Sequence, residues 1–120
     1  MAGDISRTGH ASIYGIFFDT DKTDLKPESD AALKEIAKLL SENPKLQLHV
    51  VGHTDNSGTF EHNMDLSRRR AEAVAKALSA KYGVAATRLR AHGVGPISPT
   101  STNRTEAGKA QNRRVELVEQ

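Results

Sequence analysis

Residues 50–74 read V-V-G-H-T-D-N-S-G-T-F-E-H-N-M-D-L-S-R-R-R-A-E-A-V, and their pattern decides how the chain folds. An apolar strand end is followed by a loop of polar turn residues and then by the start of an amphipathic helix. In open α/β sheets, ligand sites usually lie where a strand ends and a helix begins. This segment therefore predicts both a local fold and the position of a candidate site.

The helix in this segment is expected to begin near Asn63, a good N-cap, and to run to about Tyr82. Gly83 is a natural stop, because glycine readily adopts the left-handed conformation that ends helices. An inward stripe at helical spacing comprises Ser67, Ala71, Val74, Leu78 and Tyr82.

The strand that precedes the loop, over residues 46–52, alternates between two kinds of side chain. Leu46, Leu48 and Val50 point one way, and mostly polar residues point the other. Similar alternation recurs over residues 89–93 and 114–117. A sheet with one dry and one wet face carries helices on one side only.

The remaining elements complete the order strand, helix, strand, helix, strand, loop, strand. Residues 12–18 (S-I-Y-G-I-F-F) are rich in β-branched and aromatic side chains and predict the first strand. Pro27 suits the start of a helix that Asn43-Pro44 ends, and residues 105–112 suit a short helix. The buried stripe of the first helix comprises Leu33, Ile36, Ala37 and Leu40. We predict an α/β (α+β) two-layer sandwich of order β-α-β-α-β-β, with a mixed sheet and helices on one face.

The length of 120 residues suits one domain. We expect residues 1–10 to be a flexible lead-in and residues 11–120 to form the domain. The absence of cysteine excludes disulfides and thiolate chemistry. The first ten residues lack the apolar core of a secretory signal, so the chain is either cytoplasmic or a domain separated from its targeting segment.

Helix geometry separates the three consecutive arginines. At about 100° per residue, Asn63, Leu66 and Arg70 share one flank of the helix beside the buried stripe. Arg69 points to solvent and Arg68 lies on the opposite flank. The Arg70 guanidinium can therefore reach back towards the loop, where Asp55 supplies the opposite charge, with neutral donors such as Thr54 near by.

An aspartate and an arginine so placed have three interpretations. They could form a structural ion pair that pins the loop to the helix. The arginines could bind nucleic acid, but a net charge of +2 and the acids near by argue against this. Asp55 and Arg70 could instead recognise a ligand that carries both charges, with Asp55 on its ammonium and Arg70 forked onto its carboxylate.

Other chemistries lack their signatures. The five histidines form no HExxH grouping, and residues 19–24 lack the glycine and closing glutamate of a calcium loop. Ser57, His53 and Asp55 could be drawn as a catalytic triad, but no G-x-S-x-G elbow occurs. We therefore expect no metal, no cofactor, no catalytic residue and no nucleic-acid partner.

Several motifs in order carry a family resemblance. They are G-H-T-D-N-S-G (52–58), N-M-D-L-S-R-R-R-A-E-A-V (63–74) and N-R-R-V-E-L (112–117). F-F-D-T-D-K (17–22) and R-L-R-A-H-G-V-G-P (88–96) fit the same pattern. Together, over residues 13–118, they resemble the OmpA-like C-terminal peptidoglycan-binding domain. That family includes peptidoglycan-associated lipoproteins and the periplasmic part of flagellar stator proteins.

The resemblance implies non-covalent binding of peptidoglycan through the meso-diaminopimelate of the stem peptide. Asp55 matches the family residue that meets the ligand's ammonium, and Arg70 matches the residue that grips its carboxylate. Positions matching the rest of the pocket are Phe18, Asp19, Thr54, Asn63, Leu66 and Arg114.

The resemblance also implies a role and a place in the cell. The domain would anchor the outer membrane or a parent protein to the cell wall. The full-length protein would be periplasmic and associated with the outer membrane, with membrane contact only through segments absent from this chain. The alternative from another class is an enzyme acting on peptidoglycan stem peptides.

Overall fold

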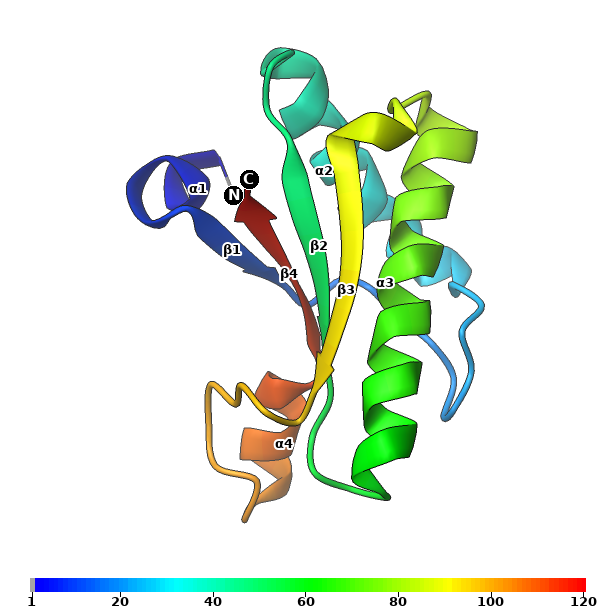
Figure 1. Cartoon of the computed structure of the whole chain (residues 1–120), viewed down its shortest axis with the longest axis vertical. Coiled ribbons are helices and arrows are strands. Elements are labelled where there is room, and N and C mark those ends of the chain that lie inside the picture. The colour runs from blue at the N-terminus through cyan, green and yellow to red at the C-terminus, as the bar shows by residue number, and fades with distance from the viewer. Residues whose placement is uncertain (1) are drawn as a thin grey trace.

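The computed structural model describes residues 2–120, which form four strands and four α-helices (Figure 1). In chain order these are α1 (Ala2–Thr8), β1 (His10–Ile13), α2 (Asp30–Glu42), β2 (Leu48–His53), α3 (Phe60–Tyr82), β3 (Leu89–Gly95), α4 (Glu106–Asn112) and β4 (Arg114–Glu119). Residues 27–29 and 86–88 are short 3₁₀ turns. The strands form one sheet in the order β1-β4-β2-β3, in which only β2 and β3 run parallel. The predicted mixed α/β fold is confirmed.

The core lies between the sheet and the two long helices. Leu33, Ile36 and Leu40 of α2 are fully buried, as are Leu48 and Val50 of β2. Burying an aliphatic side chain of this size stabilises a fold by about 1.5–3 kcal/mol. The alternation predicted for β2 is confirmed, since its intervening residues are only partly buried up to the strand's end.

Two glycines let α3 lie directly against the sheet. A Cβ atom on Gly52 of β2 would collide with the carbonyl oxygen of Ser67. A Cβ atom on Gly93 of β3 would collide with the backbone nitrogen of Arg68. This close approach fixes the distance between the end of β2 and the N-terminal half of α3, where Arg70 lies.

The chain differs from expectation before α2. Residues 2–8 form helix α1, whose Ile5 is buried in the core, so the predicted flexible lead-in is wrong across these residues; Met1 lies outside the described part. The first strand is also shorter than predicted, because it ends at Ile13. Beyond it, the Phe17 N–H donates to Ser29 Oγ, and the Phe17 carbonyl accepts from Lys26 N–H. These bonds take Phe17 out of the sheet.

Helix α3 begins three residues before the predicted N-cap. The Thr59 hydroxyl accepts a hydrogen bond from the His62 N–H, so Thr59 is the N-cap and Asn63 lies inside the helix. The predicted end is confirmed, with Gly83 in the left-handed conformation at φ 69°. Within residues 2–120, no helix has both the length and the apolar character needed to cross a bilayer.

Candidate functional site

A polar cleft of about 440 Å³ opens where β2 ends and α3 begins. Its third wall is the segment between β1 and α2. The cleft is lined by Phe18, Thr20, Asp21, Thr54, Asp55, Ser57, Asn63, Leu66, Arg70 and Arg113.

Asp55 forms the acidic end of the cleft and is only 8% exposed. Its Oδ1 accepts from the Ser57 backbone N–H at 2.8 Å, and its Oδ2 accepts from Arg113 at 2.7 Å. Burial alone would raise the pKa of Asp55, but the Ser57 N–H and the Arg113 guanidinium outweigh it and hold this pKa below its usual value. The carboxylate is therefore charged at neutral pH.

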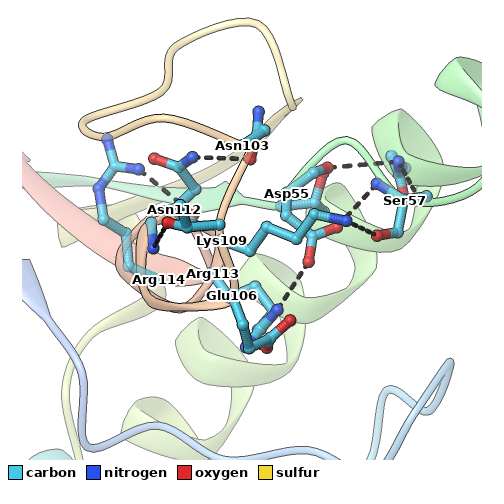
Figure 2. Close-up of polar contacts among 12 residues, drawn as sticks. Asp55, Ser57, Asn103, Glu106, Lys109, Asn112, Arg113 and Arg114 are labelled. Atoms are coloured by element: carbon cyan, nitrogen blue, oxygen red, sulfur yellow. Dashed lines mark hydrogen bonds and ion pairs between the residues drawn. The ribbon is translucent and has the colours of Figure 1, made fainter.

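Helix α4 ties itself to this end of the cleft through side chains (Figure 2). Arg113, just beyond α4, donates to Asp55 and also to Glu106 Oε1 at 2.8 Å. Hydrogen bonds to Glu106 and then to Asp55 raise the pKa of Arg113. Lys109 Nζ adds a contact of 3.0 Å to the Ser57 hydroxyl. The loop after β2 is thus braced from a segment more than fifty residues away in the sequence.

Asn63 braces the same loop from the side of α3. Its buried side-chain amide donates to the Ser57 carbonyl at 2.8 Å. Thr54 is also buried, and its N–H donates to the Gly95 carbonyl, which joins the loop to the end of β3. The loop that carries Asp55 is therefore held on three sides.

Arg70 forms the basic end of the cleft. Its Nε donates to the Lys22 carbonyl and one terminal nitrogen donates to the Asp19 carbonyl, both at 3.0 Å. The guanidinium lies over the Phe18 ring, with Cζ 4.8 Å from the ring centroid. Burial lowers the pKa of Arg70 and the charge of Asp21 partly offsets this, so the group stays a partly desolvated cation.

The predicted separation of the three arginines is confirmed. Arg68 is exposed and pairs with Asp65 and Glu72, each at 2.9 Å. Arg69 is exposed as well and pairs with Asp65 at 3.0 Å. Only Arg70 enters the cleft.

Six of the predicted site residues line this cleft: Phe18, Thr54, Asp55, Asn63, Leu66 and Arg70. Asp19 contributes its carbonyl to Arg70 while its exposed carboxylate pairs with Lys26 at 3.4 Å. Arg114 lies outside, buried against Ser98 and Glu116. The contact of these residues with a ligand stays a prediction.

The interpretation of Asp55 and Arg70 as a structural ion pair is wrong, because Asp55 pairs with Arg113. Sequence reasoning selected Arg114 and missed Arg113. The alternation of the last strand holds the signal: Arg113 stands two residues before the buried Val115, on the side that faces α3.

Among the residues that the structure describes, the cleft lacks a cluster of side chains that could bind a metal ion. Across residues 2–120, no three or more His, Cys, Asp or Glu side chains gather closely enough to suggest a metal ion. The cleft instead brings together carboxylates and guanidinium groups, with Asp55 and Arg70 on different elements and Asp21 and Arg113 beside them, and this mixture of charges suits a small zwitterionic group.

Comparisons with known proteins match most of the chain. The model of the OmpA family matches residues 17–113. "Probable lipoprotein YiaD" of Escherichia coli K12 is 45% identical over 103 residues, which cover 86% of this chain and 47% of that protein. "Peptidoglycan-binding protein ArfA" of Mycobacterium bovis is 38% identical over 103 residues, covering 86% of this chain and 31% of that protein.

A solved structure has a similar fold. The peptidoglycan-associated lipoprotein of Burkholderia pseudomallei is 37% identical and superposes with a TM-score of 0.77, covering 88% of each chain. The chain spans about half the length of the first curated relative and about a third of the second.

Proposed function

The chain belongs to the OmpA family, and from this premise we propose that it is a non-enzymatic module that binds peptidoglycan. Two relatives support the proposal by name, one a peptidoglycan-associated lipoprotein and one a peptidoglycan-binding protein. The match to the first extends over nearly the whole of both chains. The module tethers the protein that carries it to the cell wall.

The ligand group is the zwitterionic centre of meso-diaminopimelate in the stem peptide. One observation carries this assignment: Asp55 and Arg70 line the same cleft and do not pair with each other. The Asp55 carboxylate accepts the ligand's ammonium, and the Arg70 guanidinium forks onto its carboxylate.

Both groups have bonding capacity left for this ligand. A carboxylate has about four acceptor positions, of which the Ser57 N–H and Arg113 use two. A guanidinium has about five N–H donors, of which Arg70 spends two on carbonyl oxygens. The Phe18 ring and Leu66 supply apolar walls for the methylene chain of diaminopimelate.

The setting of this module is the periplasm, with the parent protein attached to the outer membrane. The first curated relative is a probable lipoprotein, and the solved relative is a lipoprotein.

Cosedimentation with purified diaminopimelate-type sacculi tests the binding. Asp55→Ala and Arg70→Ala should each weaken binding by roughly 2–5 kcal/mol, because each leaves one charge of the bound ligand without its partner. Arg69→Ala is the matched control, since Arg69 is exposed outside the cleft. Wild-type pelleting by either cleft variant would refute the assignment.

Two further measurements test the identity of the ligand and distinguish a binding module from an enzyme. Sacculi with lysine in place of diaminopimelate keep an ammonium but lack the carboxylate for Arg70, so they should pellet the protein poorly. Equal pelleting would overturn the diaminopimelate assignment. Muropeptides should remain intact after long incubation, whereas cleaved stem peptides would support the alternative of an enzyme acting on them.

A further inference from the structure

Two histidines meet on the face of the sheet opposite α2 and α3. His49 of β2 stands in register with Arg90 of β3, and His92 of β3 stands in register with Val51. The two histidines are therefore diagonal neighbours on one face of two parallel strands, which lie side by side in Figure 1. Nδ1 of His49 lies 2.8 Å from Nε2 of His92, and the ring centroids are 4.8 Å apart.

This spacing is short enough for a shared ligand. Metal–imidazole bonds measure about 2.0–2.1 Å, so two nitrogens on adjacent corners of a square or octahedron lie about 2.9 Å apart. Tetrahedral corners with the same bonds lie about 3.4 Å apart. The observed 2.8 Å is the length of an N–H···N hydrogen bond and is also close to the spacing of adjacent square or octahedral corners, which the two rings reach by turning their facing nitrogens toward a common point. Tetragonal geometry is typical of Cu²⁺ and Ni²⁺.

We propose that His49 and His92 form a two-histidine site for a divalent transition metal, with Cu²⁺ and Ni²⁺ favoured over Zn²⁺. Water fills the other positions, because the face is open to solvent and His92 is exposed. On metal binding, the proton on the facing nitrogen moves to the far nitrogen of the same ring, so both facing nitrogens offer lone pairs and both imidazoles stay neutral.

The protonation state of the pair suits this role. A metal needs neutral imidazoles, and the 2.8 Å contact between the two ring nitrogens requires one of them to lack a proton. The charge of Arg90, which stands in register with His49, opposes a cation, so the site should bind more weakly than a three- or four-ligand site. The pair lies outside the cleft lined by Asp55 and Arg70, so its metal binding is independent of peptidoglycan binding.

Calorimetric titration of the 120-residue chain with CuCl₂ or NiCl₂ near pH 7.5 tests the site. The wild type should bind one equivalent, and His49→Gln and His92→Gln should each weaken this binding by at least about tenfold. His62→Gln is the matched control, because His62 is exposed and pairs with Asp21 elsewhere. Asp55→Ala should leave metal binding unchanged.

Magnetic resonance locates the metal. Substoichiometric Cu²⁺ should broaden the resonances of His49, His92 and their strand neighbours before those of other residues. The proposal fails if no metal binds, if both variants bind as the wild type does, or if broadening centres on His10 or the amino terminus. It also fails if Zn²⁺ binds more tightly than Cu²⁺ and Ni²⁺.

Discussion

The two ends of the cleft are built in different ways. At the acidic end, Asp55 is neutralised by the side chain of Arg113, which Glu106 holds in turn. At the basic end, Arg70 is held by the backbone carbonyls of Asp19 and Lys22 and by the Phe18 ring. Among residues 2–120, no carboxylate forms an ion pair with Arg70.

This difference shows how each end can be disturbed. Side-chain partners can be removed by mutation, so the acidic end depends on Arg113, between α4 and β4, and on Glu106 of α4. Carbonyl partners persist whatever side chain they carry, so the basic end depends on Arg70 itself. A ligand carboxylate at Arg70 also meets a cation that forms no ion pair with any carboxylate among residues 2–120, which favours binding there.

The largest expected effect acts on the strand that carries the acidic end. His53, the last residue of β2, is buried and its ring nitrogens form no hydrogen bond within residues 2–120, although Nε2 lies 3.9 Å from Glu116 Oε2. Burial, then Arg114, lowers the pKa of His53 to about 4, against the opposing charge of Glu116. Between pH 6.5 and 4, His53 is protonated in the unfolded chain but stays neutral in the folded chain. The free energy of unfolding should therefore fall by at most about 3 kcal/mol between pH 6.5 and 4.

Urea denaturation between pH 7 and 4.5 measures this loss. His53→Gln cannot titrate, so its stability should change less with pH, and the difference between the two proteins isolates His53 from His49. Parallel curves for wild type and variant would show that His53 does not govern the pH dependence.

The next largest effect is expected from a substitution of Arg70 at the basic end of the cleft. Arg70→Lys keeps the charge but loses the planar fork and the second carbonyl contact, so affinity for sacculi should fall by about 2 kcal/mol. Binding isotherms with sacculi at fixed salt measure the change. Unchanged affinity would mean that charge alone suffices at this end.

A smaller effect is expected from breaking the brace at the acidic end. Arg113→Gln removes the donor to Asp55 Oδ2, and the half-exposed pair should contribute about 1 kcal/mol to binding through the orientation of Asp55. The pKa of Asp55 should rise, because burial then acts with less opposition. Carboxyl ¹³C titration reports that pKa directly. Tighter binding by the variant would identify Arg113 as a competitor of the ligand instead.

The smallest effect is expected at Asp19 and tests whether Arg70 is held by the backbone carbonyl rather than by the Asp19 side chain. Asp19→Ala removes an exposed carboxylate but keeps the carbonyl that accepts from Arg70, so binding should change by less than about 0.5 kcal/mol. The same isotherms measure it. A loss as large as that of Arg70→Lys would show that the Asp19 side chain contacts the ligand.

Local pattern predicted most of the fold and part of the cleft. The periodicities of Leu33, Ile36 and Leu40 and of Leu48 and Val50 identified core positions that are fully buried. Helix geometry alone separated Arg70 from its neighbours, because direction around a helix follows from position in the sequence. Helix α1 escaped prediction because, among residues 3–8, Ile5 is the one buried side chain and the others are exposed.

Side-chain pairs between residues far apart in the sequence could not be predicted, for a different reason. Nothing in the local pattern of Asp55 indicates whether Arg70 or Arg113 is its partner, since both lie far away along the chain. Asn63 looked like an N-cap because asparagine suits that position, yet Thr59 takes it and leaves the Asn63 amide to brace the loop.

By itself, the sequence determined the helices, the alternating strands, the family and a charged segment between residues 50 and 74, because these depend on short-range periodicity and on ordered motifs. The tertiary structure alone decided which charges meet. The packing of α3 on Gly52 and Gly93 sets the distance across the cleft, and the return of β4 beside β2 brings Arg113 to Asp55. Pairing across more than fifty residues is fixed by sheet topology, which no local pattern encodes.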